Sequence, residues 1–133
     1  MKLEPLYRLQ FSYPESFDAV DERLLFAEGY CSGRLSGRFR AANHARVRAD
    51  GAWLPALSGA VSTDDGAEVL LRLVGVGRPN AKPQGRIVAA ITHAAPGDYA
   101  WLNEVVGVVC GEVRGGREIV LDVAELVWEP LSE

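Results

Sequence analysis

The sequence predicts an all-β fold: a single antiparallel up-and-down β-barrel of about eight to ten strands with one short helix, formed by residues 1–133 as one domain. Three observations support this. Apolar and polar side chains alternate with a period of two in successive segments, as half-buried strands require. Turn signals separate these segments about every 8–12 residues. Glycines recur inside the predicted strands, where strong coiling needs them, at positions 33, 37, 59, 75, 77, 107 and 111. A β-sandwich is the alternative architecture.

The predicted strands follow one another along the chain with short connections. They cover residues 3–13, 24–31, 33–40, 56–63, 68–78, 86–93, 105–114 and 117–129, and residues 46–54 are predicted to turn at Asp50-Gly51. Three hairpin turns are predicted at Asp50-Gly51, Asp65-Gly66 and Gly115-Gly116, because these pairs tolerate the positive φ that tight hairpins need. Sequential antiparallel strands of this kind remove their exposed sheet edges by closing into a barrel.

The remaining segments are predicted as connections. Pro14 is expected to end the first strand, and the acidic residues 15–23 to form a mobile loop or short helix. Residues 79–85 are predicted as an exposed loop, because proline, asparagine and glycine punctuate them. Residues 96–103 are the helical candidate, one or two turns long, with Asp98 capping the first turn.

Composition and charge exclude several classes of function. The net charge of −4 argues against sequence-independent nucleic-acid binding, and no aromatic residues interleave with the local arginines for base stacking. No apolar run reaches the roughly 20 residues of a membrane helix, and Glu4 and Pro5 break the apolar character of a signal peptide. The cytoplasm is therefore the expected location. Cys31 and Cys110 are expected to be buried reduced thiols.

Several motifs together resemble one protein family. The pattern Ser32-Gly33-Arg34-Leu35-Ser36-Gly37, followed by Asn43-His44, Ala49-Asp50-Gly51 and Thr63-Asp64-Asp65-Gly66, resembles the DUF3237 (UPF0311) proteins. Tyr99-Ala100-Trp101-Leu102-Asn103 and the Gly111-Glu112 and Asp122-Val123 region match the same family's second half, so the resemblance covers almost the whole chain. It implies a lipocalin-like single-domain barrel of no general assigned activity, some of whose members lie among natural-product biosynthesis genes. Many members carry a Gly-Ala-Asp-Trp type sequence where this chain has Ala42-Asn43-His44, which puts a shared chemistry in doubt.

The candidate site is predicted at one mouth of the barrel. We expect Asn43 and His44 to line it, near Arg46 and an inward-facing Glu112. His44 would move a proton, Glu112 would act as a carboxylate with a pKa raised by burial, Asn43 would donate to a carbonyl oxygen, and Arg46 would hold a carboxylate. Tyr99 and Trp101, on the short helix, are expected to cap this end or the opposite one.

Each of these residues also has a structural interpretation. His44 is equally consistent with an exposed strand connection, and Glu112 with a cross-strand ion pair to Arg72 or Arg114. His93 is expected to serve a turn at a strand end. The two histidines and scattered carboxylates show no metal-ligand spacing, so no metal and no cofactor are predicted.

Three functions remain open at this stage. The first is a barrel that binds a small apolar or carbonyl compound and acts on it by proton transfer, as an isomerase, lyase or cyclase. The second is a binding or carrier barrel without catalysis, and the third is an oligomeric interaction module whose core is filled by its own side chains. A homodimer is also expected, because residues 119–128 are apolar on both faces and one barrel buries only one of them.

Overall fold

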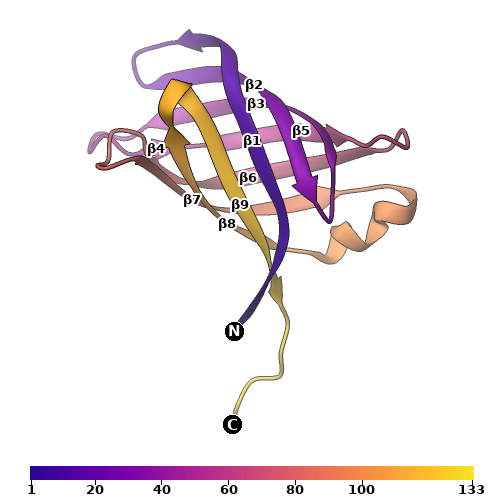
Figure 1. The fold of residues 1–133 in the computed structure, drawn as a ribbon. Helices are drawn as coiled ribbons and strands as arrows, with labels where there is room; N and C mark the ends of the chain where they lie inside the picture. Colours follow the sequence, from indigo (N-terminus) through magenta and orange to yellow (C-terminus); the bar gives the residue numbers. More distant parts are fainter.

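The predicted barrel is confirmed by the computed structural model, which describes residues 1–115 and 117–133. Each main strand pairs with the next along the chain, and the last pairs with the first, so eight antiparallel strands close on themselves (Figure 1). A ninth, two-residue strand, β4, bridges β3 and β6. The elements are β1 (Lys2–Asp18), β2 (Glu22–Gly33), β3 (Gly37–Val47), β4 (Trp53–Leu54), β5 (Ala56–Ser62), β6 (Glu68–Arg78), β7 (Gly85–Ala94), η1 (Gly97–Glu104), β8 (Gly107–Arg114), η2 (Gly115–Arg117) and β9 (Glu118–Val127).

The alternation of the sequence fills the middle of the barrel with apolar side chains. One set of alternate residues points inward from every long strand and is almost completely shielded from solvent: Leu9, Phe39, Val61, Val69 and Ile91. Branched and aromatic side chains on alternate positions pack well against their cross-strand neighbours. The centre of the barrel is therefore a packed core, and any ligand space must lie toward an end.

Two of the predicted turns have the expected geometry. Gly51 and Gly66 adopt φ of +87° and +88°, which a side chain would strain. The Gly51 N–H donates to the carbonyl of Arg48, and the Gly66 N–H donates to that of Thr63. In the third predicted turn, Gly116 lies outside the described residues. The connection between β8 and β9 continues to Arg117.

Three local predictions are wrong. Pro14 does not end β1, because a β-bulge between Ser12 and Glu15 absorbs the proline and the strand continues to Asp18. Residues 15–23 are therefore mostly strand, with a turn of only three residues between β1 and β2. Residues 33–40 are not one coiled strand, since Gly33 and Gly37, with φ of +139° and +157°, flank a turn between β2 and β3.

The predicted helix is present, but its details differ. η1 is a 3₁₀ helix whose N-cap is Pro96, and Asp98 lies within the first turn without capping it through its side chain. Proline at the cap leaves no side-chain oxygen to accept from the first N–H groups. Across the described residues, no helix is long and apolar enough to cross a membrane.

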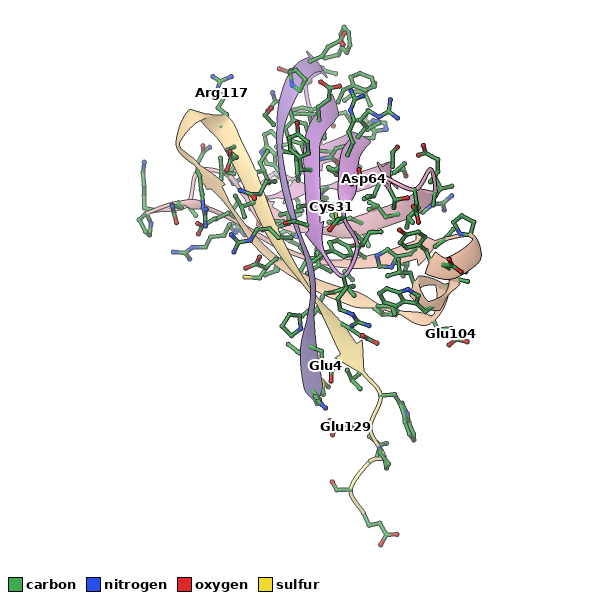
Figure 2. All side chains as sticks on the ribbon, turned by 45° about the vertical axis from the view of Figure 1, so that its right-hand side comes forward. Glu4, Cys31, Asp64, Glu104, Arg117 and Glu129 are labelled. Carbon is green, nitrogen blue, oxygen red and sulfur yellow. The ribbon has the colours of Figure 1, made fainter. Side chains whose placement is uncertain are left out.

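Arg117 offers a test of backbone strain in the β8–β9 connection. It adopts φ of 63°, a region that favours glycine, and its side chain points away from the barrel (Figure 2). Arg117→Gly is expected to raise the free energy of unfolding by about 1 kcal/mol, because glycine removes the Cβ clash. Arg117→Ala is the control, since it removes the same charge but keeps the Cβ. Equal denaturant midpoints for the two variants would contradict the strain.

Candidate functional site

One end of the barrel holds a cavity and the other is closed. The cavity, of about 90 Å³, is lined in part by residues of β4 and the start of β9. These segments lie at the end of the barrel opposite η1 (Figure 1). Its wall is almost entirely apolar and includes Phe11, Trp53, Pro55 and Pro79. An enclosed apolar wall with a few polar groups is the usual chemistry of a small-molecule site.

Asn43 and Tyr13 supply polar groups within this cavity. Asn43 is only 4% exposed, and its Oδ1 accepts from the Ala56 backbone N–H at 3.1 Å while its Nδ2 donates to Tyr13 Oη at 3.0 Å. The Tyr13 oxygen is thus an acceptor, which leaves its hydroxyl proton to donate elsewhere. Burial raises the pKa of Tyr13, and the Asn43 hydrogen bond partly opposes this. The phenol therefore stays protonated and can serve as a donor.

The mouth of the cavity is held by an arginine stacked on a tryptophan. The Arg23 guanidinium lies 4.6 Å from the centre of the Trp53 ring. Two contacts to Asp18, of 2.5 and 3.2 Å, fix the guanidinium in place. The extension of β1 and β2 beyond the bulge thus positions Trp53 at the cavity.

Of the residues predicted at this mouth, the structure brings only Asn43 to the cavity. β3 is continuous, so its alternation turns Asn43 inward and His44 and Arg46 outward. The side chain of His44 is 62% exposed and its Nε2 lies 3.1 Å from Glu22 Oε1. The prediction that His44 and Arg46 line the mouth is therefore wrong.

The predicted inward orientation of Glu112 is also wrong. Glu112 shares its face of β8 with Val108 and exposed Cys110, whereas Val109 and Val113 point into the barrel. Its carboxylate accepts from Arg114 Nε at 2.8 Å, on the outer surface. Valines on both faces of this strand made the outer face resemble an inner one. Glu112 does pair with Arg114, but the two residues lie two apart on β8, so this is not the cross-strand ion pair that the alternative predicted.

Tyr99 and Trp101 lie at the closed end, away from the cavity. Tyr99 Oη donates to the Asp65 carboxylate at 3.2 Å. Trp101 is covered by the Arg34 guanidinium at 4.6 Å, and Arg34 also donates to Glu125 at 3.0 Å. With Leu102 fully buried beneath it, η1 closes this end of the barrel.

A polar pair inside the closed end was not predicted from the sequence. Tyr7 Oη and His93 Nε2 are 2.6 Å apart, and their rings meet edge to face at 5.7 Å. Burial raises the pKa of Tyr7 above its usual range, and it lowers that of His93, whose buried Nδ1 has no hydrogen-bond partner. The signal was present, since His93 continues the inward alternation of Ile91.

The two cysteines differ in environment. Cys31 is buried inside the barrel (Figure 2), its Sγ donates to the Leu35 carbonyl at 3.2 Å, and burial raises the pKa of its thiol to about 12. Cys110 is exposed, so the expectation that both thiols are buried holds only for Cys31. In the described part of the chain, no three His, Cys, Asp or Glu side chains lie close enough to share a metal ion.

Comparison with solved structures supports the fold. The chain is similar to a beta-barrel like protein from Acinetobacter baumannii (TM-score 0.82, 22% identity, 95% of this chain and 96% of that one). It is also similar to a conserved protein of unknown function from Rhodopseudomonas palustris (TM-score 0.82, 18% identity, 95% and 97% covered). An enzyme from Penicillium herquei shares the fold at a TM-score of 0.63 and 17% identity, with 92% and 93% covered. No family model matches the chain. No curated protein matches it either.

Because His93 is partly buried, the protein is expected to lose stability in acid. Its pKa is lower in the folded chain than the ordinary value near 6.5, so the unfolded chain binds the proton more tightly. The free energy of unfolding should be highest above about pH 6.5 and should fall as the pH drops below it. His93→Gln is expected to flatten this fall, measured as denaturant midpoints between about pH 7 and pH 5.

His44→Gln is the matched control, since it removes the chain's other histidine from the outer face. It should leave the fall between pH 7 and pH 5 in place. A wild-type profile in the His93→Gln variant would show that His93 does not titrate against folding.

Proposed function

We propose that this protein binds a small, mainly apolar molecule with one hydrogen-bond acceptor in the cavity beside Tyr13. The observation that carries the proposal is the Tyr13 hydroxyl, whose oxygen accepts from Asn43 and whose proton is left to donate. A ligand carbonyl or ether oxygen would accept that proton. The apolar wall around it favours a ligand that offers little else to hydrogen-bond.

The size of the cavity limits the ligand. A dry cavity of about 150 Å³ accommodates benzene, so a space of about 90 Å³ suits a few carbon atoms or one end of a larger molecule. The remainder of a larger ligand would leave through the mouth beside Trp53. There the Arg23 guanidinium stacks on the indole, which keeps one wall of the exit in place.

A non-catalytic binding or carrier role fits this chemistry better than proton transfer. Among the described residues that line the cavity, none is a carboxylate or a histidine that could act as a general base. A proton-transfer enzyme (isomerase, lyase or cyclase) is the second candidate, because protonated Tyr13 is a suitable donor to a developing oxyanion. The similar fold of the Penicillium herquei enzyme is consistent with it.

Two further expectations belong to this proposal. Membership of the DUF3237 (UPF0311) family stays a prediction from the sequence motifs, supported by the barrel fold. A cytoplasmic location is supported by the two free cysteines, which suit a reducing compartment.

Small ketones and their hydrocarbon counterparts test the binding proposal. We expect cyclohexanone or acetophenone to shift the indole N–H resonance of Trp53 in NMR titrations, because Trp53 lines the cavity. Tyr13→Phe should weaken ketone binding about 5- to 10-fold, the value of roughly one hydrogen bond, while cyclohexane and ethylbenzene bind unchanged. Tyr30→Phe, at an exposed outer position, is the matched control and should leave ketone binding unchanged.

Gly77→Val tests the cavity itself. A Cβ at Gly77 would have no heavy atom closer than 3.7 Å, so valine fits the backbone while its methyl groups occupy ligand space. This variant should fold and lose both ketone and hydrocarbon binding. Unchanged binding in both Tyr13→Phe and Gly77→Val would place the ligand elsewhere.

Hydrogen exchange tests the second candidate. If the barrel catalyses proton transfer, the wild type should speed exchange of the α-hydrogens of acetophenone in D₂O, followed by mass spectrometry, and Tyr13→Phe should lose this effect. Exchange no faster than in buffer, with ketone binding intact, would leave binding as the function.

A further inference from the structure

The outer face of β6, β7, β8 and β9 carries a continuous apolar surface. Alternate residues that face away from the core pair across these strands in rows. One row runs through Val74, Ala90, Val108 and Ala124, and the next through Val76, Val88 and Cys110. Val106 and Leu126, which share a backbone hydrogen bond, extend it at the η1 end. We call these residues the outer apolar face.

The outer apolar face is one contiguous patch of nine residues. At about 4.8 Å between strands and about 7 Å between rows, it covers roughly 300 Å² of sheet. Single exposed apolar residues are ordinary, but a contiguous patch of this size commonly marks an interaction site. It would form the apolar centre of a standard interface, in which each partner buries roughly 800 Å² including a polar rim.

The two halves of the outer apolar face have complementary shapes. On the β6–β7 side Val74 and Val88 protrude, with 62% and 59% of their surfaces exposed. On the β8–β9 side the surface is hollowed into a groove of about 440 Å³, whose floor includes the small residues Cys110 and Ala124. Valines that stand out and a groove that could receive them thus lie on the same face.

We propose that two copies of this chain form a homodimer through their outer apolar faces, with the two-fold axis parallel to the strands between β7 and β8. This operation places Val74 and Val88 of each copy over the groove of the other. It also brings the two copies of Cys110 near the axis. With sheets about 10 Å apart, their sulfur atoms come within about 10 Å of each other.

Charge favours a second copy over a charged partner. In the rows themselves every side chain is uncharged, and charges begin only at the edges. Arg72 lies beside Val74, and Asp122, next to Cys110, is already paired with Arg8 at 2.7 Å. An uncharged surface gives a strongly acidic or basic partner little to recognise, whereas an identical uncharged surface leaves no buried charge unpaired.

Molar mass and thiol cross-linking test the dimer together. Light scattering of the wild type at micromolar concentration should give about twice 14.4 kDa. A short bifunctional maleimide should link two chains through Cys110, because Cys31 is buried, and Cys110→Ser should abolish the link. Val88→Glu should weaken dimerisation by at least about 100-fold, since it buries an unpaired carboxylate.

Val20→Glu is the matched control: it makes the same substitution at an exposed valine in the β1–β2 turn and should leave the dimer intact. Circular dichroism verifies that each variant folds, and Val74→Glu replaces Val88→Glu should the latter misfold. A wild-type mass of 14.4 kDa would overturn the proposal. A folded Val88→Glu dimer, or a dimer that Cys110 does not cross-link, would also overturn it, because either places the contact on another surface.

Discussion

The pairing of β1 with β9 determines the rest of this structure. It joins Lys2 to Val127 at one end and Phe11 to Ile119 at the other, and so turns a row of sequential hairpins into a closed surface without edges. Closure divides every strand into an inner and an outer face, because successive side chains point to opposite sides. A residue's chemistry then depends on its place in this alternation: Asn43 can meet a ligand and His44, its neighbour, cannot.

The two ends of the closed surface differ because different segments cover them. At one end η1 places Leu102 beneath its backbone and the Arg34–Trp101 stack outside it, which leaves the Tyr7–His93 pair shielded. At the other end short turns connect the strands, and the cavity remains beside Asn43. A packed centre with one open end leaves space beside the core only at that end, where the Tyr13 hydroxyl has a proton left to donate.

Local signals made the fold predictable from the sequence, whereas the candidate site depends on strand phase. The turns at Gly51 and Gly66 follow from two-residue motifs whose backbone needs are local. The phase of β3 relative to the core is different, because the sequence predicts strand at residues 34–36, where the structure has a turn. Without that turn, the sequence places Asn43 and His44 in a connection between strands, where both could face a ligand. Likewise, the bulge at Ser12–Glu15 shifts the register beyond Pro14, and only the pairing with β2 reveals that the strand continues.

The strands β8 and β9 show why alternation alone does not identify the interior. Both carry apolar residues on their two faces, so a period-two pattern is equally satisfied by either assignment. Glu112 follows Val108 and Cys110 on one face, and only the packing of Val109 against the core shows that this face is the outer one. This ambiguity has a physical source. A strand that is apolar on both faces buries its inner face in the core and leaves an apolar outer face exposed. The apolar residues of the outer face thus account for two predictions. They made the face that carries Glu112 resemble an inner face, and they led to the expectation of a partner.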